Sequence, residues 1–223
     1  ERGRTVRQRT KDTWGLWRKH TLNPESNVQF GEGGAGTYSD GKLYTRSKKR
    51  GDVLKVLQSF IAYGADPDIR INTHPHIGTN KLPGIIENMR EAILQAGGEI
   101  HFETKLTDFE IQNGQITHLI VNEQQQIQAD AVILATGHSA RDIFELLHQK
   151  QIAIEAKPFA LGLRIEHPQS LIDQIQYHQA IRGAFLPPAA YSLVTQAKGH
   201  GVFSFCMCPG GIIAPASSNT NEL

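Results

Sequence analysis

Glycines crowd one short stretch of this sequence, residues 31–42, which reads Gly-Glu-Gly-Gly-Ala-Gly-Thr-Tyr-Ser-Asp-Gly-Lys. Five glycines within eleven residues exclude a regular helix or strand there. Because glycine lacks a side chain, several backbone N–H groups can converge on one anionic oxygen, and Thr37 and Ser39 can add hydroxyl donors. The stretch therefore predicts a loop that binds a phosphate-bearing ligand. The alternative is a flexible surface loop in which Asp40 and Lys42 simply pair in solvent.

A second candidate lies where the hydrophobic residues 130–137 end in Ala-Thr-Gly. A continuous apolar run is typical of a strand that is covered on both faces of a parallel sheet. Ligands of open α/β sheets bind beyond the carboxyl ends of such strands, and Gly137 after Thr136 lets a flat ligand approach the backbone closely. His138 follows, where an imidazole can move a proton. The chain has ten histidines, so a structural or exposed role for His138 is the alternative.

The only two cysteines, Cys206 and Cys208, offer redox or metal chemistry. Their spacing is shorter than the C-x-x-C of redox pairs. A metal site shared with His74 and His76 is an alternative, but spacings this short are not diagnostic of structural zinc, and we expect no metal. Packing at a strand end is the favoured interpretation, and a reaction of one cysteine with substrate stays open. Two cysteines provide no disulfide framework and indicate a reduced, cytoplasmic protein.

Local signals predict the elements that must position these residues. Helical spacing or capping predicts helices over residues 6–18, from Asp52 to Gly64, over residues 85–94, from Ser139 to Leu147, and over residues 169–177. The first helix should bury Val6, Thr10, Trp14 and Trp17, and the expected N-caps are Thr5, Asp52 and a capping box of Ser139 with Asp142.

Strand signals are more numerous than helix signals. They predict strands at residues 69–71, 99–103, 106–112, 115–121, 130–137, 152–156, 159–166, 191–195 and 202–207. Asn113-Gly114 predicts a two-residue hairpin turn, because both residues accept positive φ at low cost.

The order of these elements predicts an α/β fold. A strand, a β-hairpin, a second strand, a glycine and a capped helix indicate an incomplete Rossmann-like domain whose crossover is a small antiparallel insertion. After Lys150 short strands predominate. We therefore expect one domain at residues 1–150 and the start of a β-rich α+β domain at residues 151–223.

Four stretches carry a resemblance over essentially the whole chain. They are Glu1-Arg2-Gly3, residues 31–42, Ala135-Thr136-Gly137 and residues 205–211. Together they resemble bacterial FAD-dependent dehydrogenases with a fold of the glutathione-reductase type. The resemblance implies an FAD-dependent oxidoreductase that holds extended FAD between an FAD-binding domain, residues 1–150, and a substrate domain that begins at residue 151. Flavin would perform the hydride chemistry on an unidentified small molecule, and NAD(P)H would at most dock transiently as electron donor.

The resemblance also implies roles for single residues. Glu1 corresponds to the carboxylate that binds the adenosine ribose, Arg2 lies beside it, and the backbone of Leu106 is a candidate for adenine contact. The residues implied around the diphosphate and flavin are Gly33, Gly34, Ala35, Gly36, Thr37, Ser39, Asp40, Lys42, Thr136 and Gly137. An exposed terminal Glu1 and a Leu106 side chain that only packs are the alternatives.

Charge argues against nucleic acid or a membrane surface as the main partner. Lys and Arg number 23 against 22 Asp and Glu, which leaves +1. The densest basic run, Arg46 to Arg50, is short enough to be a solvated loop, and a flavin fold that serves RNA binding or tRNA modification is the alternative function. No apolar stretch approaches the ~18 residues that suggest a membrane span.

The first residue is Glu rather than Met. The G-x-G-x-x-G turn that the resemblance implies should lie about 20 residues before Glu1. We therefore expect the chain to be an internal piece of a longer enzyme that, alone, binds FAD weakly or not at all and is inactive.

Overall fold

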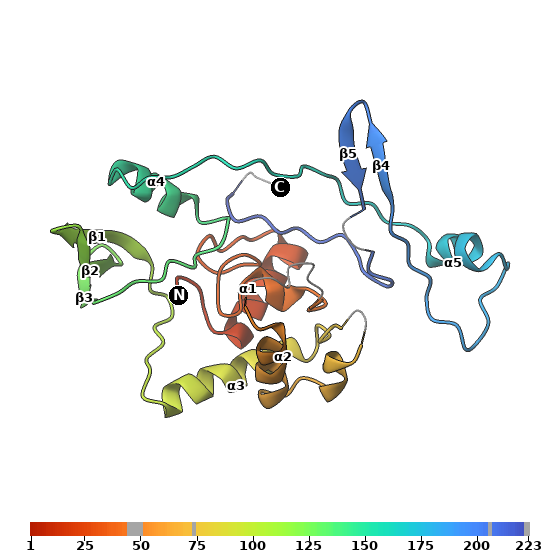
Figure 1. Ribbon diagram of the computed structural model, residues 1–223, viewed down its shortest axis with the longest axis horizontal. Coiled ribbons are helices and arrows are strands. Elements are labelled where there is room, and N and C mark those ends of the chain that lie inside the picture. Colours follow the sequence, from red (N-terminus) through yellow and green to blue (C-terminus); the bar gives the residue numbers. More distant parts are fainter. Residues whose placement is uncertain (44–50, 73–74, 205–206, 221–223) are drawn as a thin grey trace. The chain divides into compact units, whose positions relative to one another are not determined.

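The computed structural model describes residues 1–43, 51–72, 75–204 and 207–220 (Figure 1). Over these residues the protein is of mixed α/β type, with helices and two small antiparallel sheets. It divides into one unit of Glu1–Lys157 with Pro215–Leu223 and a second unit of Pro158–Ala214. The predicted domain change near Lys150 stays a prediction.

The helices of the first unit follow the predicted order. Its helical elements are α1 Val6–Lys19, η1 Ala35–Tyr38, α2 Val53–Ala62, η2 Pro67–Arg70, α3 Leu82–Gln95 and α4 Arg141–Gln149, where η denotes a 3₁₀ turn. Thr5 and Asp52 are the N-caps of α1 and α2, as predicted, and their side chains accept hydrogen bonds from the amides of Gln8 and Lys55. Helix α1 packs against α3 (Figure 1).

The predicted capping box of α4 is wrong. The N-cap of this helix is Ala140, and no side chain caps it. The hydroxyl of Ser139 instead lies 3.1 Å from Nδ1 of His138, and the carboxylate of Asp142 lies 3.1 Å from Nη1 of Arg2. Asp142 thus pairs with a distant cation, while its Oδ1 also accepts a hydrogen bond from the amide of Ile143 in the first turn of the helix.

The predicted hairpin is confirmed and extends to a third strand. The strands β1 Leu106–Gln112, β2 Gln115–Val121 and β3 Gln125–Gln128 form an antiparallel sheet in the order β1-β2-β3. Asn113 and Gly114 have φ values of 52° and 78°, as the two-residue turn requires. Strand β3 has no counterpart among the predicted strands.

Residues 99–103 do not form the predicted strand, but they lie along the first residues of the chain. The terminal amino group of Glu1 donates to the carbonyl of His101 at 2.9 Å, and the amide of Glu103 donates to the carbonyl of Gly3 at 3.0 Å. These hydrogen bonds fix the chain start against a segment a hundred residues away.

Other strand predictions are wrong in this structure. Residues 69–71 belong mostly to η2, whose Ile69 is 2% exposed. Residues 130–137 and 152–156 have no strand beside them within the described residues, and Ile133 is 94% exposed. A strand needs a neighbour for its backbone hydrogen bonds, and periodicity in one segment cannot supply it.

The core of the first unit consists of two hydrophobic clusters. One contains Ala65, Ile69, Ile77, Leu82 and Ile85. The other contains Phe30, Ala140 and Ile143, with Leu106 and Leu147 packed against them. The second cluster joins the start of the glycine-rich loop, the start of β1 and helix α4.

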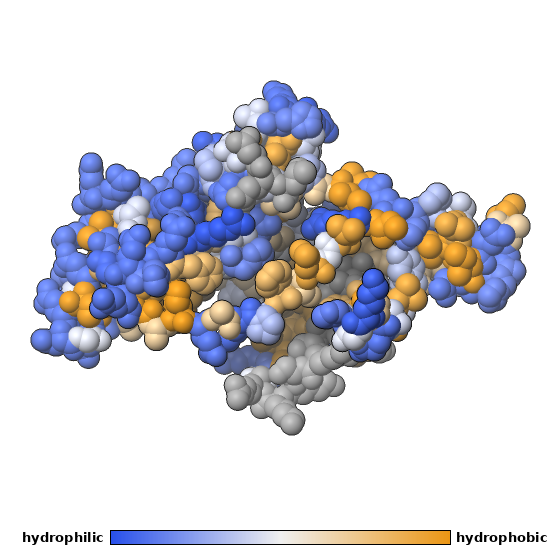
Figure 2. All heavy atoms as spheres, turned by 90° about the horizontal axis from the view of Figure 1, so that it is seen from above, coloured by the Kyte–Doolittle hydropathy of each residue, from blue (hydrophilic) through white to orange (hydrophobic). Residues whose placement is uncertain are grey.

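In the second unit, helix α5 Gln169–Tyr177 is confirmed at its predicted bounds, and β4 Val194–Ala197 pairs with β5 His200–Phe203. The strands predicted at residues 191–195 and 202–207 are thus confirmed in part, with bounds shifted to those of β4 and β5, and residues 205 and 206 lie outside the described residues. Residues 159–166 form no strand, and Leu163 is 99% exposed. Hydrophobic side chains are accordingly visible on the surface (orange in Figure 2).

Asp173 fixes α5 to the segment that follows it. Its Oδ1 accepts hydrogen bonds of 2.8 Å from the amide of Ala189 and from the side chain of Gln169. The Ala189 amide and then the Gln169 side chain lower the pKa of Asp173 below its ordinary value. The ionised carboxylate is thus the form that this contact favours.

We expect Ile85→Ala to lower the free energy of unfolding of the first unit by about 2–5 kcal/mol, because Ile85 is 2% exposed and truncation leaves a cavity. Ile93→Ala in the same helix is the control, since Ile93 is 46% exposed and should cost much less. Urea unfolding followed by circular dichroism measures both variants. Equal losses would contradict the packing described for α3.

Candidate functional site

The glycine-rich loop is held by Arg9 of α1, whose side chain is fully buried. Its guanidinium donates hydrogen bonds of 2.6–3.2 Å to the backbone carbonyls of Asn27, Val28, Gly31, Glu32 and Gly34. The ring of Tyr38 lies 4.9 Å from the guanidinium carbon. Burial lowers the pKa of Arg9 from its ordinary value. The loop therefore folds around a cation from the helix that precedes it.

The predicted inward face of α1 is correct at Val6 but wrong at Trp14, and Arg9 is buried although hydrophobic spacing did not place it there. The buried residues of this helix are Val6, Arg9, Thr13 and Leu16, and Trp14 is 50% exposed. The true face is also a helical stripe, but it contains a charge and a hydroxyl. Hydrophobic periodicity alone favours the tryptophans and assigns Arg9 to solvent.

The loop contains one regular turn, η1, contrary to the expectation of none. Gly33 and Gly34 precede it with φ values of 83° and 60°, in the region that favours glycine. A Cβ atom on Gly31 would lie 2.6 Å from Cδ of Arg9. Glycine is therefore required at position 31 because Arg9 approaches so closely. At Gly33 and Gly34 glycine is favoured because a residue with a side chain would be strained at these positive φ values.

Glu32 joins the loop to two helices. Its carboxylate accepts a 2.7 Å hydrogen bond from the amide of Val6 and two, of 2.8 and 3.1 Å, from Nη1 of Arg90 in α3. The side chains of Glu32 and Arg90 are 10% and 19% exposed, so solvent screens this pair weakly.

Glu1, for which the resemblance implies a ribose-binding role, lies beside the loop. Its Oε1 accepts hydrogen bonds from the amides of Gly3, at 2.8 Å, and Gly31, at 3.0 Å. No hydrogen bond from the described residues reaches its Oε2. The structure thus brings the chain start and the glycine-rich loop together through one carboxylate.

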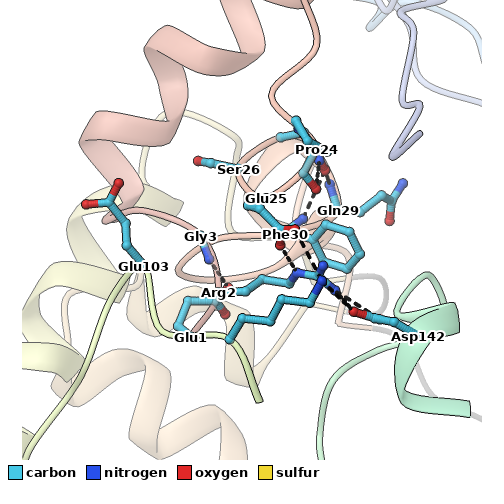
Figure 3. A network of polar contacts seen from close by, with 12 residues as sticks. Glu1, Arg2, Gly3, Pro24, Glu25, Ser26, Gln29, Phe30, Glu103 and Asp142 are labelled. Atoms are coloured by element: carbon cyan, nitrogen blue, oxygen red, sulfur yellow. Dashed lines mark hydrogen bonds and ion pairs between the residues drawn. The ribbon is translucent and has the colours of Figure 1, made fainter. Parts of the chain in front are cut away.

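Arg2 is at the centre of an ion-pair network (Figure 3). Its guanidinium lies 2.6 Å from Glu25 and 3.1 Å from Asp142, and it stacks 4.2 Å above the ring of Phe30. Lys105 also reaches both carboxylates, at 3.3 Å for Glu25 and 3.0 Å for Asp142. Two cations and two anions from four separate segments therefore meet at this point.

The network changes the pKa values of its carboxyl groups. Burial raises the pKa of Glu25, but the hydrogen bonds and charges of Arg2 and Lys105 outweigh burial, so the net pKa is lowered. The same balance of burial against the two cations lowers the pKa of Asp142. Both carboxylates are therefore ionised at neutral pH.

An open cavity of about 490 Å³, lined by polar and charged residues, borders this network. Its walls include Arg2, Arg4, Glu25, Glu103, Lys105 and Thr107. The charged groups on these walls are paired with one another, Arg2 and Lys105 with Glu25 and Arg4 with Glu103. Leu106 begins β1 between two lining residues, and its side chain packs in the second hydrophobic cluster.

Thr136, Gly137 and His138 are exposed and do not line this cavity. Gly137 has a φ of 75°. Ala140, three residues further along, packs against Phe30, which directly precedes the glycine-rich loop. The two predicted ligand-binding segments thus flank one hydrophobic cluster, but among the described residues no backbone hydrogen bond joins residues 31–42 to residues 136–137.

The other predicted loop residues make contacts within the fold. Thr37 is buried, and the hydroxyl of Ser39 donates to the carbonyl of Gly36 at 2.7 Å. The carbonyl of Asp40 accepts from the amide of Gly78, and Lys42 forms an isolated β-bridge with His76.

Some candidates lie elsewhere. Cys206, His74 and the basic run from Arg46 to Arg50 lie outside the described residues. Cys208 is exposed and belongs to the second unit. Within the described ranges, no group of three or more His, Cys, Asp or Glu side chains is arranged to hold a metal ion, and no helix has the length and apolar character to cross a membrane.

Comparison with known proteins supports a flavin-related chain. Residues 158–223 match the family model of the FAD-dependent protein, C-terminal domain-like. This match supports an FAD-dependent family. An uncharacterized protein of Clostridium beijerinckii (strain ATCC 51743 / NCIMB 8052) is 43% identical over 225 residues, which cover all of this chain and 42% of that relative. The chain thus spans less than half of the relative's length, and the expectation of an internal piece stays a prediction.

We expect the double variant Glu25→Gln, Asp142→Asn to be less stable than the unchanged protein at pH 7. A carboxyl group whose pKa is lowered by folding stabilises the fold above its unfolded pKa, about 4, and loses that contribution as pH falls through the folded pKa. The difference in free energy of unfolding should therefore shrink toward about pH 3. Urea titrations at both pH values measure it.

Glu99→Gln is the control, because the Glu99 side chain is 80% exposed and an exposed pair contributes little. A stability difference for the double variant that is the same at both pH values would show that the network does not act through the ionised carboxylates.

Proposed function

We propose that this chain contributes part of the FAD site of a flavin-dependent oxidoreductase with a Rossmann-like FAD-binding domain. The observation that carries the proposal is the shared carboxylate of Glu1, which holds Gly3 and the first glycine of the loop, Gly31, at one place. In dinucleotide-binding folds an acidic residue binds the ribose hydroxyls. Glycine-rich backbone held beside that residue can offer N–H groups to an anion such as the diphosphate. The match of residues 158–223 to an FAD-dependent family supports the choice of FAD.

Different residues of this chain would then bind different parts of FAD. Oε2 of Glu1 would accept ribose hydroxyls, Arg2 and the backbone of Leu106 would border the adenosine, and the loop amides would bind the diphosphate. The proposed flavin-binding set is Gly33, Gly34, Ala35, Gly36, Thr37, Ser39, Asp40, Lys42, Thr136 and Gly137. FAD, when bound, supplies the hydride chemistry.

Catalytic roles are proposed on chemical grounds alone. The exposed His138 is our candidate for proton transfer near the flavin, and Cys206 or Cys208 for contact with substrate. The substrate would be a small molecule, with NAD(P)H as a transient electron donor. No described residue favours the RNA-binding alternative.

The full-length protein should purify yellow, with the absorption spectrum of oxidised flavin and about one FAD per chain. Anaerobic addition of NADH or NADPH then tests the electron donor, because hydride transfer to flavin bleaches the visible band. A colourless full-length protein that takes up no FAD would refute the proposed function. Bound flavin without bleaching would leave the site intact and exclude only the nicotinamide donor.

Gly36→Val should reduce the FAD content of the full-length protein, with affinity weakened by about tenfold or more, ~1.4 kcal/mol. A Cβ at Gly36 would meet nothing within 4 Å, so the apoprotein should melt at an unchanged temperature while the side chain obstructs the ligand. Gly84→Ala is the control, since Gly84 lies in α3 and its Cβ position is also open. Unchanged flavin affinity in Gly36→Val would remove the loop from the site.

A further inference from the structure

Arg9 is a buried cation whose hydrogen-bond acceptors are all backbone carbonyls. A buried charge is costly unless its hydrogen bonds are satisfied, and five carbonyls satisfy this one. The carboxylates whose charge acts on Arg9 are Glu1 and Glu32, and neither accepts a hydrogen bond from its guanidinium within the described residues. Oε1 of Glu1 accepts from the amides of Gly3 and Gly31, and Glu32 is engaged by Arg90 and by the amide of Val6. The positive charge is therefore balanced by oriented peptide groups rather than by a paired carboxylate.

This arrangement decides where the loop amides point. All peptide bonds of the described residues are trans, so each N–H points opposite to the preceding carbonyl. The carbonyls of Glu32 and Gly34 face Arg9, so the amides of Gly33 and Ala35 point away from it. Both residues are exposed, and neither amide donates a hydrogen bond within the described chain.

We propose that Arg9 is a positioning residue for the diphosphate of the ligand, an inference that rests on the proposed FAD site. It draws the carbonyls of the loop inward and thereby presents the amides of Gly33 and Ala35 outward as donors to one anion. The buried charge and the aligned peptide dipoles add to the same positive potential at the loop surface. The arrangement also requires glycine at position 31, because any side chain there would displace Arg9.

The test compares ADP with adenosine, which differ only in the diphosphate, as competitors of FAD on the full-length protein. Arg9→Met should weaken the binding of FAD and of ADP by about tenfold or more, ~1.4 kcal/mol, and leave the affinity for adenosine unchanged. The FAD and ADP affinities of Arg9→Lys should lie between those of the unchanged protein and those of Arg9→Met. An ammonium keeps the charge but has only three donors and lacks the planar geometry of a guanidinium. If Arg9→Met does not fold, the selective loss in Arg9→Lys decides the question.

Arg7→Met is the matched control, since Arg7 lies on the same helix, is exposed and pairs with Glu87. It should change neither ADP nor adenosine affinity. Equal weakening of ADP and adenosine in the Arg9 variants, or no weakening of either, would overturn the positioning role. If the wild-type protein binds neither FAD nor ADP, the proposed function is refuted. That outcome can be told apart from a refutation of the positioning role of Arg9, in which the wild-type protein binds both ligands.

Discussion

The burial of one guanidinium is the constraint on which this region of the protein depends. The side chain of Arg9 is fully buried, so its hydrogen-bond acceptors must come from the protein rather than from water. It finds them in the carbonyls of residues 27–34, so a segment rich in glycine, with little preference of its own, takes a defined path. The same contact prescribes glycine at Gly31, since Arg9 occupies the space of a side chain.

Around that loop, contacts between distant segments replace a continuous sheet. The first residues of the chain bond to His101 and Glu103, and Arg2 reaches Asp142, which is 140 residues away in sequence. Phe30 packs at the same place against Ala140. Because several weak interactions share these segments, their effects should be coupled rather than additive. A ligand at the neighbouring cavity would meet a polar wall that is already ordered.

The extended hydrophobic segments illustrate the limit of a strand signal. Residues 130–137 and 159–166 have the composition of buried strands, yet Ile133 and Leu163 are almost fully exposed. In contrast, residues 106–121 form their hairpin because each strand has its partner two residues away across a turn. Local pairing is available to any hairpin, whereas an isolated strand depends on neighbours that its own sequence does not specify.

The sequence by itself determined the elements whose cause is local. Helix α5, the cap of α1 at Thr5 and the turn at Asn113 all depend on residues within a few positions of one another, and each is found where predicted. Only the tertiary structure decided that Arg9 points inward and that Asp142 pairs with Arg2. The physical reason is that a charged side chain is placed by the hydrogen-bonding partners that folding brings to it, and here those lie 18 to 140 residues away along the chain.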